Sequence, residues 1–200
     1  MIPAVPIRRV PLFEAVEKLH PRRILDIGVC PGVITLGLIR FAQTFVTDPW
    51  QIGYYGFDLF MNLPPAYELD GTRGASKETI MSILAPTRAN ITLIEGDTRR
   101  TLPQFIAKKP VAMDLIQIDG GHSAETIRSD WESCRKLMHE KTVLIFDDYW
   151  DRTDGGARST VDAIDRNAYS VEFRDGGRFP RDGRLAPSYT MKVAVVRRLK

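Results

Sequence analysis

Short apolar runs that end in an acidic residue recur along this chain, and they constrain its fold more than any other feature. Two of them are residues 116–119 and 143–148, and three more end at Asp26, Asp58 and Glu95. Stretches of helical periodicity separate the runs, which is typical of an α/β fold with helices on both faces of a parallel sheet. Because ligands bind at the carboxyl ends of such strands, the sequence predicts that several acids gather at one ligand-binding edge.

The expected elements follow from the same alternation. The predicted strands are residues 23–27, 54–58, 91–95, 113–119 and 142–147, with a final pair at 169–175 and 189–197. The predicted helices are residues 11–19, 33–44, 76–84, 102–107, 123–139 and 159–167. Ser76 is a plausible N-cap because its hydroxyl can accept from an amide of the first turn. No linker or internal repeat divides the 200 residues, so we expect a single domain, 1–200.

Composition excludes several classes of protein. The net charge of +3 is too small to predict nucleic-acid binding, and Cys30 and Cys134 provide neither a disulfide framework nor a thiolate metal cluster. The first residues contain no apolar segment of the kind found in signal peptides. No apolar run approaches the ~20 residues of a membrane span. We therefore expect a cytoplasmic protein with neither a nucleic-acid nor a membrane partner.

A glycine-containing turn follows the first predicted strand. Gly28 permits a positive φ or the close approach of a ligand, and Gly32 allows tight packing at the start of the next helix. The free amides of that helix start favour an anionic group. A plain strand-to-helix turn would give the same pattern, so the turn alone leaves both interpretations open.

The series of strand-end acids resembles the class I S-adenosylmethionine-dependent methyltransferases over nearly the whole chain. The first motif of that family corresponds to Asp26-x-Gly28-x-Cys30-x-Gly32, with Cys30 in place of the usual middle glycine. The resemblance implies a Rossmann-like, doubly wound and mostly parallel seven-stranded sheet with an antiparallel last strand. The seventh strand would lie between the fifth and the sixth. The implied cofactor is S-adenosyl-L-methionine.

The same resemblance assigns roles at the cofactor end. Asp58 would bind the ribose hydroxyls. The glycines would line the methionine end, and the residues after strand three would flank the adenine. The full implied set of cofactor-binding residues is Asp26, Gly28, Gly32, Asp58, Asp97, Thr98 and Asp119.

The segments Asp119-Gly120-Gly121-His122 and Asp147-Asp148 resemble a narrower group, the metal-dependent O-methyltransferases of the macrocin and macrolide-sugar branch. In that group an Asp-x-x-His motif supplies a metal ligand and a general base, and an acidic pair completes the metal site. The resemblance implies Asp119, Asp147 and Asp148 as metal ligands, with His122 and Asp119 as catalytic residues.

Elementary chemistry gives these residue types a purpose. Carboxylates suit Mg²⁺, which lowers the pKa of a coordinated hydroxyl and fixes its position. A neutral imidazole, whose ordinary pKa is about 6.5, can then take the proton. We therefore predict Mg²⁺-assisted O-methylation of a small molecule such as a sugar or a natural product. The sequence is also compatible with a homo-oligomer.

Three other functions remain open at this point. A metal-independent methyltransferase would use Asp119 to orient the nucleophile directly, and a non-catalytic scaffold would bind an adenosine ligand or a partner protein. A Rossmann dehydrogenase ranks last because Cys30 and Val33 replace the second and third glycines of its motif.

The remaining expectations concern the surroundings of the site. Loops 61–74 and 149–157 would form the acceptor side, where Tyr67, Tyr149 and Trp150 either stack on the acceptor or pack the loops. Asp130 is expected on the solvent face of its helix, and His139 at the end of that helix.

Overall fold

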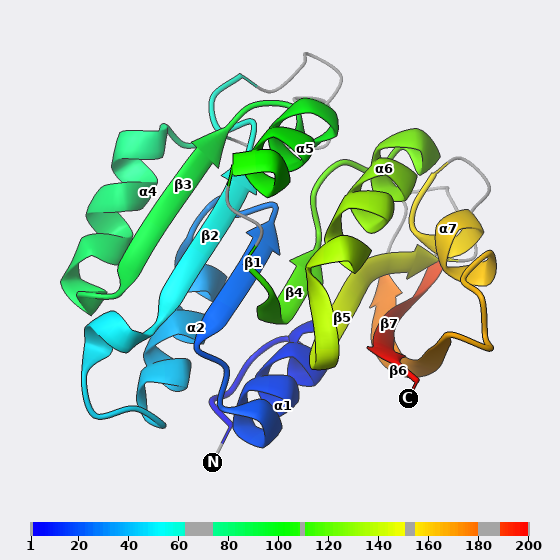
Figure 1. The fold of residues 1–200 in the computed structure, drawn as a ribbon, viewed down its shortest axis with the longest axis horizontal. Helices are drawn as coiled ribbons and strands as arrows, with labels where there is room; N and C mark the ends of the chain where they lie inside the picture. The colour runs from blue at the N-terminus through cyan, green and yellow to red at the C-terminus, as the bar shows by residue number, and fades with distance from the viewer. Residues whose placement is uncertain (1, 63–73, 109–110, 151–154, 180–188, 200) are drawn as a thin grey trace.

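The computed structural model describes residues 2–62, 74–108, 111–150, 155–179 and 189–199. Its seven strands form one sheet in the order β3-β2-β1-β4-β5-β7-β6 (Figure 1). Strands β1 to β5 run parallel, and β7 is antiparallel to both of its neighbours. The predicted α/β fold and the place of the seventh strand are therefore confirmed. The strands are β1 (Arg23–Ile27), β2 (Gly53–Asp58), β3 (Asn90–Glu95), β4 (Met113–Ile118), β5 (Met138–Trp150), β6 (Tyr169–Phe179) and β7 (Tyr189–Arg198).

Helices cover both faces of the sheet because the side chains of buried strands alternate between the two faces. Ile24 packs in a core cluster with residues of α1, α2 and α4, whereas the next residue, Leu25, packs with residues of α5, α6 and α7. Figure 1 shows where these helices lie around the sheet. Among the described residues, none of the helices has the length and apolarity that crossing a bilayer requires. The helices are η1 (Ile7–Arg9), α1 (Val10–Leu19), α2 (Val33–Gln43), η2 (Pro49–Gln51), α4 (Lys77–Leu84), η3 (Ala85–Thr87), α5 (Thr98–Lys108), α6 (Ala124–Cys134), η4 (Arg135–Leu137) and α7 (Arg158–Asp162).

Most element boundaries agree with the expectation, including the N-cap at Ser76, whose hydroxyl accepts from the Thr79 amide. Helix α5 begins at Thr98, four residues earlier than predicted, because Asp97 accepts the amide of Arg99 and so caps the helix start. Helix α6 ends earlier than predicted, and His139 lies in β5 rather than at a helix end. Helix α7 is also shorter than residues 159–167.

The expectation for Asp130 was wrong. Its side chain is completely buried, because α5 packs against α6 and the early start of α5 brings Thr98 beside this acid. Burial raises the pKa of Asp130 to about 7, and neither carboxylate oxygen accepts a hydrogen bond from a described residue. Helical periodicity alone could not show which helix would cover this position.

Stability should therefore depend on pH through Asp130. The carboxyl has a pKa near 4 in the unfolded chain and about 7 in the fold, so it costs stability progressively as the pH rises from about 4 to 7. We expect Asp130→Asn to leave stability nearly unchanged at pH 4 and to raise it at pH 8, by at most about 4 kcal/mol. Urea unfolding at the two pH values measures this difference.

Glu132→Gln is the matched control, because Glu132 lies on the same helix with its side chain 50% exposed. It should show little pH-dependent change. An Asp130→Asn variant that is destabilised at pH 8 would contradict the burial of an unpaired acid.

Candidate functional site

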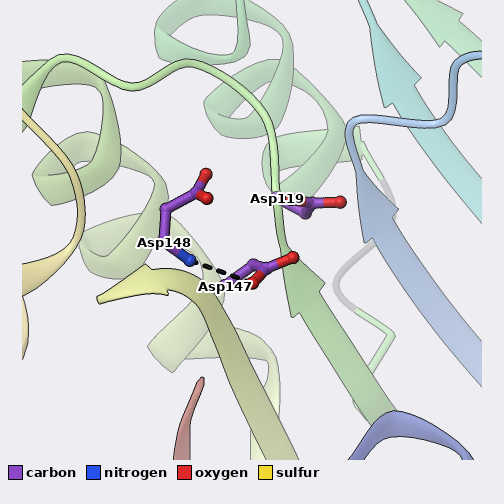
Figure 2. Close-up of side chains that lie close together, drawn as sticks. All are labelled: Asp119, Asp147 and Asp148. Carbon is purple, nitrogen blue, oxygen red and sulfur yellow. Dashed lines mark hydrogen bonds between the residues drawn. The ribbon is translucent and has the colours of Figure 1, made fainter. Parts of the chain in front are cut away.

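Three acids meet where β4 and β5 reach the carboxyl edge of the sheet. Asp119 follows the end of β4, and Asp147 and Asp148 lie in the last part of β5 (Figure 2). One oxygen of each carboxylate lies within 4.8 Å of the other two. Asp147 and Asp148 are buried and Asp119 is nearly so. The fold therefore brings together the three residues expected to bind a metal ion.

A β-bulge explains how two consecutive residues contribute to one cluster. Phe146 pairs with Ala194 and Tyr149 pairs with Lys192, so two residues of β5 oppose a single residue of β7. Within the bulge Asp148 has a φ of 58°, and its amide donates a hydrogen bond to Asp147 Oδ1 at 3.0 Å. A regular strand would send neighbouring side chains to opposite faces. The bulge interrupts that alternation and keeps both carboxylates near Asp119.

Two arginines from the N-terminal segment neutralise part of this cluster. Arg9 Nη2 lies 2.6 Å from Asp119 Oδ2, and Arg9 Nη1 lies 3.1 Å from Asp147 Oδ2. Arg8 Nη1 lies 3.4 Å from the same Asp147 oxygen. Arg9 is buried, whereas about a third of the Arg8 side chain is exposed.

Sequence reasoning missed both arginines, although a signal was present. Helix α1 leads directly into β1, at the edge opposite the strand ends. A helix that packs antiparallel to the strand after it carries its own first residues back to the carboxyl edge. Arg8 and Arg9 stand immediately before α1.

The three carboxylates of the cluster are costly to bury without positive charge beside them. Burial is the largest cause that raises the pKa of Asp119 well above its usual value; the charge of Asp147 raises it further, and the Arg9 guanidinium opposes the rise. Gln117 adds only a 3.3 Å hydrogen bond from Nε2 to Asp119 Oδ2. Breaking a buried ion pair by removing one partner typically costs about 3–5 kcal/mol. These acids therefore need a cation near them.

His122 approaches the cluster from the other side. Its Nε2 lies 3.2 Å from Asp148 Oδ2, and its ring packs edge-on against Trp150 at 5.3 Å. The Trp150 indole N–H donates to the Gly155 carbonyl at 2.5 Å, and the Gly156 amide donates to the His122 carbonyl at 2.8 Å. Trp150 is thus a buried packing residue that holds the histidine loop. It is not an exposed platform for an acceptor, and Tyr67 lies outside the described residues.

The glycine turn after β1 touches the same edge. Gly28 has a φ of 94°, and a Cβ added there would lie 2.1 Å from the carbonyl oxygen of Asp119. The Asp119 amide donates to the Ile27 carbonyl at 2.9 Å. The residue must therefore be glycine because the backbone after β4 passes directly beside it. Gly32, with a φ of 86°, is the N-cap of α2, as its predicted place at the helix start requires.

Asp58 links the loop after β1 to the loop after β2 through hydrogen bonds. Its Oδ2 accepts the Cys30 amide at 2.9 Å and its Oδ1 accepts the Phe60 amide at 2.7 Å. Each carboxylate oxygen can accept a second hydrogen bond, and Asp58 is only half-buried. Cys30 itself is half-buried, and burial raises the pKa of its thiol to about 11, so it is not a reactive thiolate.

Asp26 lies deeper, inside the sheet. It accepts hydrogen bonds from the Tyr54 hydroxyl at 2.7 Å and from the Thr35 hydroxyl at 3.2 Å, and burial raises its pKa to about 6. Its Oδ1 is buried, and no group in the described part of the chain donates a hydrogen bond to it. The fold places this acid beneath the glycine turn.

The residues after β3 complete the edge. Asp97 pairs with Arg99, whose Nη2 lies 2.6 Å from Asp97 Oδ2, and this contact lowers the pKa of the acid. Thr98 is buried at the start of α5. The Gly96 amide donates to the Asp58 carbonyl at 2.9 Å, which keeps this loop beside the loop after β2. Six of the seven expected cofactor residues thus lie along β1 to β3, and the seventh, Asp119, belongs to the acidic cluster beyond them at β4 and β5.

Solved structures share this architecture across nearly the whole chain. An O-methyltransferase from Bacillus cereus in complex with SAH matches with a TM-score of 0.64 at 18% identity, covering 98% of this chain and 83% of that one. CalS11, a TDP-rhamnose 3'-O-methyltransferase of calicheamicin biosynthesis, matches at 0.56 and 21%, covering 90% and 77%. A putative rRNA methylase from Clostridium thermocellum matches at 0.65 and 11%, covering 98% and 100%. At these identities the likeness establishes the fold.

Sequence comparison defines the family. No curated protein matches the chain. A family model described as a methyltransferase domain matches residues 25–149, which span β1 to β5 and include the glycine turn and all three acids of the cluster. The chain therefore belongs to this methyltransferase-domain family and has the class I, S-adenosylmethionine-dependent methyltransferase fold.

Proposed function

We propose that this protein is an S-adenosylmethionine-dependent O-methyltransferase that methylates a hydroxyl of a small molecule with the help of Mg²⁺. One observation carries the proposal: Asp119, Asp147 and Asp148 offer oxygens within 4.8 Å of one another, with the His122 imidazole 3.2 Å from Asp148. Oxygen ligands of this kind suit a hard divalent cation, and the neighbouring imidazole suits a general base.

The donor would bind along β1 to β3. Asp58 has lone pairs left for two ribose hydroxyls, and Asp97 with Thr98 would flank the adenine. The methionine end would lie over the turn from Gly28 to Gly32, close to Asp119. The Bacillus cereus structure has SAH bound in the same fold, which supports this placement.

The acids fit a divalent cation by their chemistry. Asp119, Asp147 and Asp148 would hold it, and Asp148 also lies beside the His122 ring. When bound, Mg²⁺ would lower the pKa of a coordinated acceptor hydroxyl. The protein's own part is to present these oxygens from two rigid strands.

His122 would take the acceptor proton. Asp148, with an oxygen 3.2 Å from Nε2, would orient the neutral imidazole. Trp150 and Gly156 would hold the ring in place through the contacts described above. The acceptor oxygen would then form its bond to the methyl group while the proton moves to the imidazole, and the methyl–sulfur bonding electrons stay on sulfur.

A small acceptor is favoured by its surroundings. CalS11 methylates a TDP-linked sugar, and its fold covers most of this chain. Next to the cluster Tyr149 packs against Phe173 with ring centroids 4.6 Å apart, and Phe173 is 39% exposed. An aromatic surface of this kind can contact a sugar ring or another ring-containing acceptor.

One observation favours a second candidate, a metal-independent methyltransferase. Arg9 already bridges Asp119 and Asp147, so the cluster has a cation supplied by the protein. In that case Asp119 would orient the nucleophile, and the ion pairs would be permanent.

The ribose assignment predicts the behaviour of Asp58→Asn. We expect this variant to bind S-adenosylhomocysteine at least about tenfold more weakly in isothermal titration calorimetry, because charge-assisted hydrogen bonds to two hydroxyls are weakened. Thermal unfolding checks that the loop contacts to Cys30 and Phe60 survive. Asp147→Asn, which alters the other half of the edge, should bind with unchanged affinity. Unchanged affinity in Asp58→Asn would remove Asp58 from the ribose role.

The metal assignment predicts that Asp147→Asn impairs metal binding and spares cofactor binding. This variant should lose Mn²⁺ binding, measured by calorimetry, while it retains S-adenosylhomocysteine binding, because Asp147 lies at the cluster and away from β2. In the wild-type protein EDTA should abolish methyl transfer to hydroxyl acceptors. Methyl transfer that persists in EDTA would instead support the metal-independent candidate.

A further inference from the structure

We propose that Arg9 is an internal counter-ion that competes with the divalent cation, so that metal binding displaces Arg9 and moves η1 away from the acidic cluster. This inference rests on the metal site of the proposed function. It concerns a residue outside the region matched by the family model, which begins at residue 25.

Arg9 occupies the oxygens that a metal ion would need. Its two terminal nitrogens lie 2.6 Å from Asp119 Oδ2 and 3.1 Å from Asp147 Oδ2, so the guanidinium spans the space between the two acids. A Mg²⁺ ion bound to both oxygens would lie about 2.1 Å from each. The ion and the guanidinium cannot fill that space together, and their like charges repel each other.

The guanidinium satisfies the cluster only in part. Asp147 Oδ2 is buried and accepts no hydrogen bond from any described residue, although Arg8 and Arg9 lie at ion-pair distance. Arg9 supplies one positive charge to Asp119 and Asp147, and Arg8 adds a partly exposed one at Asp147 alone, whereas a divalent cation would place two charges among all three carboxylates. A divalent ion of suitable size should therefore be able to replace it.

The helix η1, which carries Arg9, is a single turn that lies beside β6 and contributes no residue to the buried core clusters. The three-residue helix η1 lacks a side-chain N-cap, and the Arg9 amide donates to Pro6 O at 2.8 Å within a single turn. Ile7 is 50% exposed. The helix that follows is anchored separately by Leu12, Phe13 and Val16, which are buried in the core. A rotation at the start of α1 would therefore withdraw Arg9 and shift η1 relative to β6, while the anchored residues of α1 stay in place.

This exchange gives Arg9 two consequences for the enzyme. Without metal it keeps the buried acids paired, which protects the fold. With metal it leaves the cluster, which opens the edge where the acceptor hydroxyl must approach Asp119 and His122. The apparent metal affinity is then the intrinsic affinity reduced by the fraction of molecules in which Arg9 has left.

Calorimetric titration of Mn²⁺ into the S-adenosylhomocysteine-bound protein tests the proposal. Arg9→Gln removes the competing charge and should bind Mn²⁺ at least about tenfold more tightly than the wild type. Arg135→Gln is the matched control, since Arg135 pairs with Glu132 on the surface, away from the cluster, and should leave Mn²⁺ affinity unchanged.

Hydrogen exchange on the wild-type protein provides a readout that needs no variant. Adding Mn²⁺ should speed exchange at the amides of Arg9 and Val10, whose hydrogen bonds close η1. It should also raise the melting temperature of Arg9→Gln more than that of the wild type, because the variant begins with unpaired acids. If Arg9→Gln does not fold, hydrogen exchange alone decides.

The outcomes separate the inference from the proposed function. Equal Mn²⁺ affinity in the wild type and Arg9→Gln, weaker binding by the variant, or slower exchange of η1 with metal would overturn the role of Arg9 while leaving the metal site. Failure of both proteins to bind Mn²⁺ would remove the metal from the proposed function, and the competition with it.

Discussion

Three carboxylates buried in one place require positive charge, and the organisation of this active edge depends on that requirement. Asp119 and Asp147 come from adjacent parallel strands, so the sheet itself forces them together. Moving the two acids apart would require breaking the pairing of β4 with β5. Burying them without a positively charged partner would cost several kcal/mol. The N-terminal segment provides that charge through Arg9 and Arg8, and the His122 ring lies beside Asp148. Each of these contacts is explicable as a response to the same accumulation of negative charge.

The sheet divides this edge into two halves. The loops after β1, β2 and β3 are linked to one another by Asp58 and by the Gly96 amide, and they form the half suited to a nucleotide-like donor. The loops after β4 and β5 carry the acids and the histidine. The halves meet at Gly28, where the backbone of Asp119 passes so closely that a side chain would not fit. The donor's reactive end and the acidic cluster can therefore adjoin without any domain movement.

Local sequence was sufficient to predict the strands and their terminal acids, because buried parallel strands are continuous apolar runs and the acids interrupt them abruptly. The strand order, including β7 between β5 and β6, followed from the family resemblance. The bulge at Asp147 and Asp148 did not follow, because it depends on how β5 pairs with a strand some 45 residues later in the chain. The burial of Asp130 depends on the neighbouring helix in the same way.

Arg9 shows the other limit of sequence reasoning. It lies 110 residues before Asp119 and 138 before Asp147, and nothing local marks it as their partner. A topological argument could have placed it at the right edge, since it precedes a helix that leads back to the start of β1. No sequence pattern distinguishes an arginine that neutralises a cluster permanently from one that gives way to a metal ion.

Anomalous diffraction from crystals grown with S-adenosylhomocysteine and Mn²⁺ tests the central claim most directly. The account predicts a manganese peak coordinated by oxygens of Asp119, Asp147 and Asp148, with the Arg9 guanidinium withdrawn from Asp119 and Asp147. A cluster without a peak at saturating Mn²⁺, with Arg9 still bridging the two acids, would contradict it.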